Sequence, residues 1–438
     1  MPALTKLMIL EILNDWNYWH RNFEEYVPRA GYLNKIKLFR RSGEIIVLTG
    51  IRRSGKSTLL KLEMKDLAND REKKELVYIN FEDPRFSGNL TTNTLDMIFE
   101  AYRENINPHG EVYLFLDEVQ YVDGWEKWVR TAHELKKAKI YVTGSSSKLL
   151  SGEIATSISG RYLQLDVYPL TFCEFLVFNS IECRNISDYS VNRVAINRLF
   201  TNYLKYGGFP RIASVEEDLK KEELMSYFNT ILLKDILARF RLRNFDMLKK
   251  LVEYLLTNDT KQNSIHRVSR ALKYSYETVD DYINYSKQVY MFFELRNFNY
   301  SLKKQLVSDI KYYTIDTGFV NAVSFSFSEN IGRLYENVVF NELIRRGKNI
   351  FFLNENNIEC DFIVKEGTNI IAAYQVCYNL NEQNEQREIT GLVMACKKFD
   401  LEVGFIITES TSRTVTEEGV SIRIIPITGF LLGVTDQL

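Results

Sequence analysis

Four residues in one short loop have the types and the spacing that bind nucleotide phosphates. Gly50, Gly55, Lys56 and Ser57 complete the pattern G-x-x-x-x-G-K-S within LTGIRRSGKSTLL, residues 48–60. The glycines let the backbone wrap around negative charge, Lys56 would reach the β- and γ-phosphates, and the Ser57 hydroxyl would ligate Mg²⁺. The residues expected to contact the nucleotide here are Gly50, Ile51, Arg52, Arg53, Ser54, Gly55, Lys56, Ser57 and Thr58.

A pair of carboxylates supplies the second half of such a site. The apolar run in VYLFLDEVQ ends in Asp117 and Glu118, which places both at the tip of a buried strand. Asp117 would hold Mg²⁺ through water, and Glu118 would polarise the attacking water. Glu82, at the end of YINFED, is a rival base, but Glu118 is favoured because it adjoins the metal carboxylate.

A third polar strand end is KIYVTGSSS. Thr143 is assigned to the nucleotide site because it, or Ser145, could orient the attacking water. The alternative is that these hydroxyl residues cap a helix beginning near Ser147.

Three residues outside these strand ends are further candidates. Arg161, in SGRY, is either an arginine finger for a neighbouring subunit or part of a surface ion pair. YGGFPRI forms a rigid turn in which Pro210 could lie against adenine and Arg211 near the phosphates; a turn without a nucleotide role is equally open.

The elements that must position these residues alternate between strands and helices. Apolar runs at EIIVLT, ELVYINF, VYLFLDE, KIYVTG and YLQLDVY are separated by helix-like segments, which predicts a parallel α/β sheet. Residues 1–42 are predicted to be helical, with the aromatic residues of NDWNYWHRNFEEY at helical spacing against a core.

Composition narrows the class of protein. The chain has 438 residues, 45% of them hydrophobic, and a formal net charge of -1, so its overall charge predicts no attraction to nucleic acid or membrane. Its five cysteines are widely spaced, which disfavours a disulfide framework or a zinc site. With no long apolar run, the sequence predicts a cytoplasmic protein without a membrane partner.

Residues 246–305 follow the layout of a winged helix: helix, turn, helix, turn, longer helix and an apolar strand pair. Residues 261–304 contain eight Lys or Arg against four Asp or Glu, a local positive excess suited to DNA phosphates. The candidate recognition helix nevertheless begins with Glu277, Asp280 and Asp281, which oppose DNA docking. DNA binding, with backbone contacts from Arg267, Arg270 and Lys273, and protein contact both stay open.

Together these motifs resemble the AAA-type prokaryotic P-loop ATPases with a conserved C-terminal region of unknown function. The likeness is carried by the P-loop, LDE, TGSSS…SGRY, YPLTFCEF and YGGFPRI, and then by LLKDILAR, YYTIDTGFVNA, LYENVVFNELIRRG and ECDFIV…YQVCYNL. It implies ATP and Mg²⁺ as ligands and a C-terminal restriction-endonuclease-like domain.

That nuclease-like domain lacks part of its expected chemistry. Glu336 would be its helix acid and Asp361 its strand acid, but the E-x-K position reads Gln375-Val376-Cys377. The cysteine removes the cation that helps to generate hydroxide, and Lys365 is a substitute of unknown geometry. The expectation is that the domain keeps the fold and has lost hydrolysis.

The resulting expectation for the fold is an α/β P-loop NTPase with further domains. The predicted divisions are an N-terminal helical segment (1–42), the ATPase core (43–170), a helical lid (171–245), the winged helix (246–305), a connector (306–330) and the nuclease-like domain (331–438).

The expected function is ATP hydrolysis coupled to the C-terminal domains, with double-stranded DNA or a protein as partner. A slow nucleotide-gated switch that binds a protein partner is the alternative, and an ATP-dependent nuclease is less favoured. The oligomeric state stays open.

Overall fold

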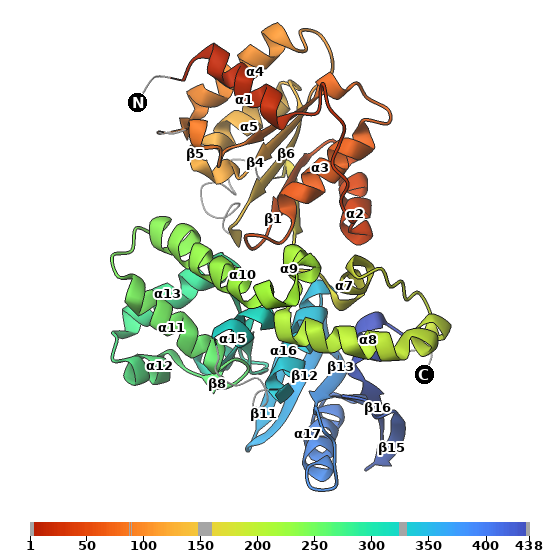
Figure 1. Cartoon of the computed structure of the whole chain (residues 1–438). Coiled ribbons are helices and arrows are strands. Elements are labelled where there is room, and N and C mark those ends of the chain that lie inside the picture. Colours follow the sequence, from red (N-terminus) through yellow and green to blue (C-terminus); the bar gives the residue numbers. More distant parts are fainter. Residues whose placement is uncertain (1–3, 87, 89, 148–159, 324–330, 435–438) are drawn as a thin grey trace. The chain divides into compact units, whose positions relative to one another are not determined.

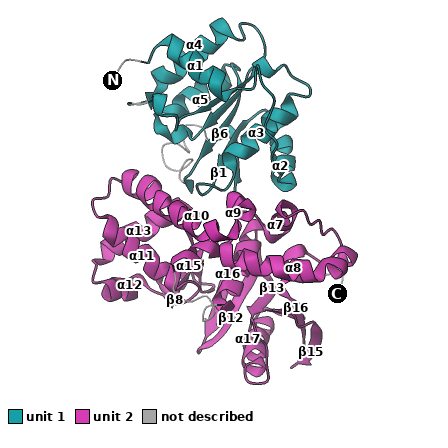
Figure 2. Cartoon of the chain, viewed as in Figure 1, with its two compact units in different colours: residues 1–167 teal, residues 168–438 magenta. Residues whose placement is uncertain are grey.

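The computed structural model describes residues 4–86, 88, 90–147, 160–323 and 331–434. These form two compact units, unit 1 (residues 1–167) and unit 2 (residues 168–438), shown in two colours in Figure 2. Each unit has its own sheet and hydrophobic core, so each is described by itself.

Unit 1 is built on a five-stranded parallel sheet. Its strands are β1 (Ile45–Thr49), β2 (Leu76–Asn80), β4 (Tyr113–Asp117), β6 (Lys139–Gly144) and β7 (Tyr162–Asp166), in the order β2-β4-β6-β1-β7. All four neighbouring pairs are parallel, which confirms the predicted parallel α/β sheet. A separate short pair joins β3 (Leu90–Thr91) and β5 (Val122–Asp123).

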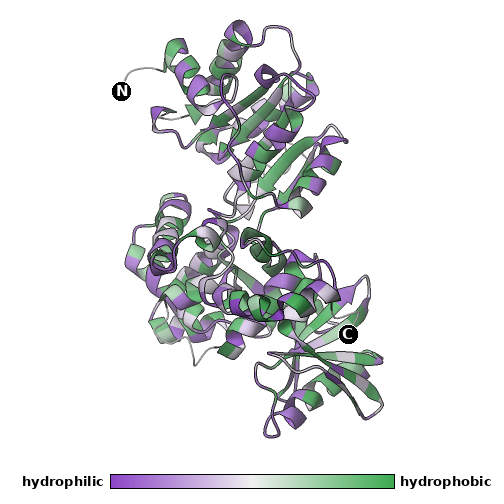
Figure 3. Ribbon diagram, turned by 45° about the vertical axis from the view of Figure 1, so that its right-hand side comes forward, coloured by the Kyte–Doolittle hydropathy of each residue, from purple (hydrophilic) through white to green (hydrophobic). Residues whose placement is uncertain are grey.

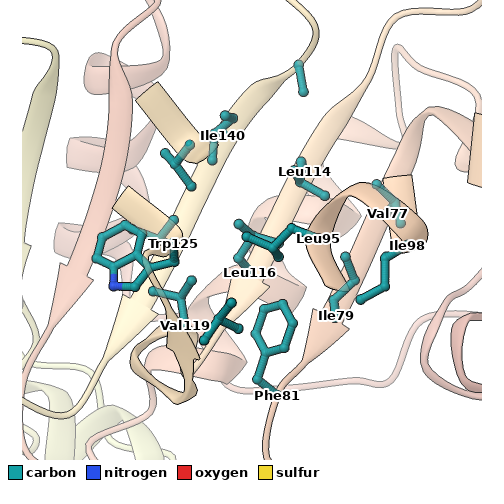
Figure 4. Close-up of a cluster of buried hydrophobic side chains, with 14 of the residues drawn as sticks. Val77, Ile79, Phe81, Leu95, Ile98, Leu114, Leu116, Val119, Trp125 and Ile140 are labelled. Carbon is teal, nitrogen blue, oxygen red and sulfur yellow. The ribbon is translucent and has the colours of Figure 1, made fainter. Parts of the chain in front are cut away.

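Helices cover both faces of this sheet because its strands are apolar on both sides. In β1, Ile45 and Val47 face one core, whereas Ile46 and Leu48 face the other. The first core, part of which is drawn in Figure 4, lies under α1 (Lys6–Trp16), α4 (Thr92–Asn105) and α5 (Trp125–Glu134). The second lies under α2 (Ala30–Arg40) and α3 (Lys56–Leu67). This three-layer order brings the carboxyl ends of the strands to one edge.

The aromatic segment between α1 and α2 is not helical, which corrects the sequence prediction. Residues 17–29 run without helix, and Asn17 pairs with the edge strand β2. Its side chain donates to the Tyr78 carbonyl at 3.0 Å and accepts from the Tyr78 N–H at 2.7 Å, while Trp19 Nε1 donates to the Leu76 carbonyl at 2.9 Å. The Asn17 amide and the Trp19 indole thus form hydrogen bonds with backbone groups at the unpaired edge of the sheet, which an extended segment can reach.

Unit 2 begins with helices, as predicted from the sequence. They are α7 (Phe172–Phe178), α8 (Ile186–Tyr206), α9 (Pro210–Ser214), α10 (Glu217–Thr230), the π-helical η5 (Ile231–Ala238), α11 (Phe245–Thr257), α12 (Ile265–Leu272), α13 (Tyr276–Gln288), α14 (Leu302–Val307) and α15 (Thr317–Val323) (Figure 1). An antiparallel sheet in the order β8-β10-β9 accompanies them, built from β8 (Gln262–Asn263), β9 (Phe292–Arg296) and β10 (Ile310–Thr314).

The break at YGGFP between α8 and α9 has a packing cause. Gly208 N–H donates to Asp316 Oδ2 at 2.7 Å, and a Cβ at Gly207 would lie 1.6 Å from Asp316 Oδ1. Gly207 also has a φ of +76°, which favours glycine. The two glycines therefore let a buried carboxyl group reach the backbone.

The C-terminal part of unit 2 holds a six-stranded mixed sheet. Its elements are α16 (Ile331–Arg345), β11 (Asn349–Glu355), β12 (Ile358–Glu366), β13 (Asn369–Val376), α17 (Glu385–Lys398), β14 (Val403–Thr408), β15 (Arg413–Glu417), β16 (Val420–Pro426) and α18 (Ile427–Leu432), with the order β11-β12-β13-β14-β16-β15. Figure 3 shows mainly apolar strands beside helices that have both apolar and polar residues. The helices and strands predicted after residue 331 are present; β15 was not predicted, because its pattern RTVTE is largely polar.

No helix in the described part of the chain is both long enough and apolar enough to cross a membrane.

Candidate functional site

The loop after β1 has the backbone that its glycines predict. Gly50 has a φ of +144°, and a Cβ there would lie 2.1 Å from the carbonyl oxygen of Val167. Gly55, with a φ of +99°, immediately precedes α3. Both conformations are costly for other residues, so the two glycines shape a loop whose N–H groups and helix N-terminus can face an anion.

Lys56 lies folded back onto this loop. Its Nζ donates to the carbonyl oxygens of Gly50 at 3.0 Å and Ile51 at 3.1 Å, and its side chain is only 3% exposed. The carboxylate oxygen Glu118 Oε1 lies farther away, at 3.8 Å. The ammonium group is therefore held mainly by neutral acceptors, which a phosphate can displace.

Two further contacts in the loop suit a phosphate-binding cradle. The hydroxyl oxygen of Ser54 is buried and has no hydrogen-bond partner among the described residues. Arg29, on the segment before α2, donates from Nη1 to the Ser54 carbonyl at 3.0 Å. The loop is thus fixed from behind and keeps one buried polar atom for a ligand.

Asp117 is held at the end of β4 by two hydroxyl groups. Tyr78 donates to its Oδ2 at 2.5 Å, and Thr143 donates to its Oδ1 at 2.5 Å. The same Thr143 oxygen accepts the backbone N–H of Glu118 at 2.9 Å. Thr143 therefore links the ends of β4 and β6 and fixes the neighbouring pair of carboxylates.

Glu118 adopts a backbone conformation that is unusual for a residue with a side chain. Its φ is +56° and its ψ +46°, and the residue is only 6% exposed. Burial raises the pKa of its carboxyl group, and the nearby Lys56 ammonium opposes that rise. Gln120 Nε2 donates to Glu118 Oε2 at 2.5 Å. The strained turn and this amide together aim the carboxylate toward Lys56.

Glu82 follows the edge strand β2 and is already engaged. Arg52 Nη1 donates to Glu82 Oε1 at 2.8 Å, and Tyr121 OH donates to the same oxygen at 3.2 Å. This arrangement fits a role in holding the loop residue Arg52, and the assignment of Glu118 as base remains the prediction.

The remaining predicted residues belong to other elements or have no described contact with these groups. Arg161 precedes β7, at the edge where strands begin, and pairs with Glu134 at 2.9 Å. Pro210 and Arg211 belong to α9 of unit 2, where Arg211 pairs with Glu223 at 3.1 Å. Their nucleotide roles remain predictions, as do those of Ser57 and Thr58 in the first turn of α3. The helix expected near Ser147 lies in residues 148–159, outside the described part of the chain.

Three residues at the site escaped the sequence analysis. Tyr78 lies within an apolar strand and looks like core, and Arg29 is remote in sequence, so neither has a local signal. Gln120 lies two residues after Glu118 in the sequence, and this closeness to the carboxylate was a usable clue.

In unit 2, the two predicted nuclease acids are brought together, but around a lysine. Lys311 of β10 lies 2.9 Å from Glu336 Oε1 and 3.4 Å from Asp361 Oδ1. Lys365 instead lies at the far end of β12, paired with Asn349. No group of three or more His, Cys, Asp or Glu residues in the described ranges has the arrangement of a metal site.

The E-x-K position of this domain is fully used inside the protein. Gln375 Oε1 accepts the Asp361 N–H at 3.2 Å, and its Nε2 donates to Glu388 Oε2 at 2.7 Å. Burial raises the pKa of the Cys377 thiol to about 11, so it is neutral at physiological pH. Neither side chain replaces the lysine of a nuclease.

Family models divide the chain into three parts. A model described as an AAA domain matches residues 42–176. Two models described as domains of unknown function match residues 197–330 and 331–430. The finer divisions into lid, winged helix and connector remain predictions.

Two curated relatives extend over most of the chain, and both are uncharacterized proteins. MJ1544 of Methanocaldococcus jannaschii is 37% identical over 393 residues, covering 86% of this chain and 85% of that protein. A protein of Haemophilus influenzae is 29% identical over 372 residues, covering 83% of this chain and 89% of the relative.

Solved structures give weaker likenesses. The ORC1 protein of Aeropyrum pernix, in complex with DNA, has a TM-score of 0.35 and 12% identity, covering 68% of this chain and 94% of that one. AMPPCP-bound DnaA from Aquifex aeolicus has a TM-score of 0.27 and 14% identity, covering 63% and 92%. These scores are too low to carry an argument about fold or function. The extended sequence identity is decisive instead: the chain belongs to the family of the M. jannaschii protein MJ1544, with an AAA domain at residues 42–176.

Proposed function

We propose that this protein binds ATP with Mg²⁺ at the loop of residues 50–58 and hydrolyses it, and that the nucleotide state is passed to unit 2. The observation that carries the proposal is the meeting of Lys56, Asp117, Glu118 and Thr143 at the carboxyl edge of a parallel sheet. A glycine loop that leads into a helix at the same edge supplies the anion-binding backbone.

Each side chain has a role that follows from its present contacts. Lys56 would exchange the carbonyl oxygens of Gly50 and Ile51 for β- and γ-phosphate oxygens, which bind an ammonium group more strongly. Ser57 and Asp117 would hold Mg²⁺, which neutralises phosphate charge when it is bound. Glu118 would accept a hydrogen bond from the attacking water. Because burial raises the pKa of its carboxyl group, it would be a stronger base than an exposed glutamate.

Gln120 is the positioning residue for Glu118 in this proposal. Its amide nitrogen faces the carboxylate at 2.5 Å, and the reverse orientation would set two oxygens against each other. Its Oε1 is buried and has no hydrogen-bond partner among the described residues. That oxygen could accept a second hydrogen bond from the attacking water, so the amide would orient both base and water.

The winged helix predicted for residues 246–305 is the element that we expect to respond in unit 2, and it extends to residue 314 because its second long strand, β10, lies in the segment predicted as a connector. Helices α11, α12 and α13 are followed by the paired strands β9 and β10, and β8 completes the small sheet. Arg267, Arg270 and Lys273 are exposed beside it, which suits DNA phosphates. DNA as the partner is therefore the first form of this proposal.

A protein partner is the second form, because of the acidic start of α13. Glu277 and Asp281 are exposed in the first half of that helix, where a recognition helix normally meets DNA. A slow switch that is reset by hydrolysis would then replace a DNA-stimulated ATPase.

The decisive experiment measures ATP affinity and turnover with and without double-stranded DNA. Wild-type protein should bind ATP·Mg²⁺, and Lys56→Ala should lose binding or turnover by at least about 100-fold. Lys65→Ala is the matched control, because Lys65 lies on the same helix, half-exposed and paired with Glu25. Full activity in Lys56→Ala would refute the proposed site.

The DNA arm separates the two forms of the proposal. Stimulation by DNA that disappears in Lys56→Ala supports a DNA-acting ATPase. A turnover far below about 1 per second that is indifferent to DNA supports the protein-partner switch.

A further inference from the structure

Four charged side chains meet at one buried point in unit 2. The Nζ atom of Lys311 lies 2.5 Å from Glu359 Oε1, 2.9 Å from Glu336 Oε1 and 3.4 Å from Asp361 Oδ1. The lysine side chain is only 4% exposed. Three carboxylate oxygens therefore converge on one cation, and that cation belongs to the protein.

Neutral donors complete the surroundings of the three carboxylates. Tyr313 OH donates to Glu336 Oε1 at 2.6 Å, and the Val376 N–H donates to Asp361 Oδ2 at 2.9 Å. Gln262 Nε2 donates to Glu359 Oε2 at 2.5 Å. Each acid thus has an ammonium contact and a second, uncharged partner, which is the condition for burying charges together.

The position of the ammonium group leaves no place for a metal ion among these oxygens. A divalent cation bound by the same three carboxylates would need them about 2.0–2.6 Å away, around the same point. Lys311 Nζ occupies that point, and its positive charge would also repel a second cation. A metal ion and this lysine are therefore alternative occupants.

The lysine and the acids come from different parts of the sequence. Lys311 lies on β10, within the first matched domain of unknown function, whereas Glu336, Glu359 and Asp361 lie in the second. The cluster thus joins the small sheet β8-β10-β9 to α16 and β12. The second domain has Cys377 where the nuclease pattern has a lysine, and Lys311 from the first domain supplies the positive charge beside its acids.

The adjoining cleft is also unsuited to a nucleic-acid backbone. Its volume is about 520 Å³, and three of its lining residues, Glu359, Asp361 and Glu388, are acidic. Arg387 lies on the same rim but is paired with Glu388. A phosphate chain entering this cleft would meet more negative than positive charge.

We infer that the Lys311 ammonium group is the resident cation of the Glu336–Glu359–Asp361 cluster, in place of a divalent metal ion. In the C-terminal domain, the cluster then links α16 and β12 to the sheet β8-β10-β9 and does not bind a metal ion. This inference stands on unit 2 alone and does not depend on ATP binding or hydrolysis in unit 1.

The test is Mn²⁺ binding to the full-length, nucleotide-free protein, measured by calorimetry. Wild-type protein should show no Mn²⁺ site that is lost in Asp361→Asn. Lys311→Met removes the charge and keeps most of the volume. The variant should bind Mn²⁺ at the cluster at least about 100-fold more tightly than the wild-type protein does, because one repelling charge has left the cluster. The double variant Lys311→Met, Asp361→Asn should lose that site. Lys365→Met, on the same strand as Asp361, is the matched control.

Every outcome decides the inference. An Asp361-dependent Mn²⁺ site in the wild type, or Mn²⁺-dependent DNA cleavage lost in Asp361→Asn, would overturn it. So would a folded Lys311→Met protein that gains no site. If this variant is unstable in metal-free buffer, its melting temperature should rise with Mn²⁺ while that of the wild type does not; failure of Mn²⁺ to rescue it would also count against the inference.

Discussion

Lys56 in unit 1 and Lys311 in unit 2 are both almost fully buried, yet their surroundings differ in kind. Lys56 donates to two backbone carbonyls, and its Nζ atom lies 3.8 Å from the Glu118 carboxylate. Lys311 is surrounded by three carboxylates, two of them within 2.9 Å, and their charges raise its pKa against the effect of burial. Carbonyl partners can be exchanged for a phosphate, whereas three carboxylates hold a lysine in place.

Motif residues alone therefore do not distinguish a site that can bind a ligand from one that is already filled by a side chain. Both sites hold a buried aspartate on a strand, Asp117 of β4 and Asp361 of β12, and both include a lysine. What differs is whether the lysine keeps neutral, replaceable partners. We expect the first arrangement in a site that binds a ligand and the second in a structural joint.

The largest expected effect is on stability, when each lysine is replaced by methionine. Lys311→Met should lower the free energy of unfolding of unit 2 by about 3–5 kcal/mol, because it leaves the buried Asp361 and the part-exposed Glu336 and Glu359 without a cation. Lys56→Met should cost less, about 1–2 kcal/mol, because its hydrogen-bond acceptors are neutral carbonyls and the Glu118 carboxylate lies farther away, at 3.8 Å.

The tryptophans allow the two units to be followed separately. Trp16, Trp19, Trp125 and Trp128, the four in the chain, all lie in unit 1. In urea, Lys311→Met should shift the circular dichroism transition of unit 2 and leave the tryptophan fluorescence transition in place. Equal losses of unfolding free energy in Lys311→Met and Lys56→Met would contradict the proposed difference between the two lysine sites.

The next effect concerns the base of unit 1. Glu118→Gln should keep ATP affinity and lower turnover by about 100- to 1000-fold, because the amide cannot accept a proton. Glu82→Gln is the matched control and should keep most of its turnover, since Glu82 is engaged by Arg52 and Tyr121. The reverse result, loss only in Glu82→Gln, would transfer the role of base to Glu82.

The sequence predicted the elements of unit 1 well because its signals are local. Buried strands read as apolar runs, and the Gly50-to-Ser57 pattern fixes a loop between a strand and a helix. The prediction of a helix at residues 17–29 was wrong, because their aromatic spacing also fits a helix. Their conformation depends instead on hydrogen bonds to the unpaired edge of β2.

The lysine cluster of unit 2 could not be predicted in the same way. Glu336 and Asp361 were found as a pair from the nuclease-like pattern, but Lys311 lies 25 and 50 residues away from them in the chain. Its strand KYYT gives only the signal of a buried strand. A contact between distant segments that depends on one buried charge leaves no local pattern to find.

A smaller effect in unit 2 depends on pH. Burial raises the pKa of Asp316 to about 6, and the N–H groups of Gly208 and Gly318 only partly oppose this. The folded state therefore binds the proton more tightly than the unfolded state, so stability is greatest below about pH 4 for this group. It should fall by about 3 kcal/mol in total as the pH rises from about 3 to about 7, with most of the loss between about pH 4 and about pH 6.

Urea unfolding followed by circular dichroism at several pH values would measure that slope. Asp316→Asn should lose the Asp316 part of this slope and keep the part from Asp259 and Asp361, whose pKa values are also raised by burial. Asp309→Asn, which changes a half-exposed carboxylate of the same unit, should keep the full slope. An unchanged slope in Asp316→Asn would assign the pH dependence to other buried acids.

The smallest expected effect tests how Glu118 is held, and so whether unit 1 is prepared for hydrolysis beyond binding. Gln120→Ala should lower kcat about tenfold with little change in the KM for ATP, because the amide contacts the base and not the phosphate-binding loop. Gln164→Ala is the matched control, since the Gln164 amide also donates to a carboxylate, Asp166, at 2.8 Å. In the Glu118→Gln background, Gln120→Ala should cause almost no further loss, because orienting the base and the water speeds the reaction only when the Glu118 carboxylate can accept the proton. A full additional tenfold loss there would mean that Gln120 acts independently of Glu118, and an increase in KM alone would place it in nucleotide binding.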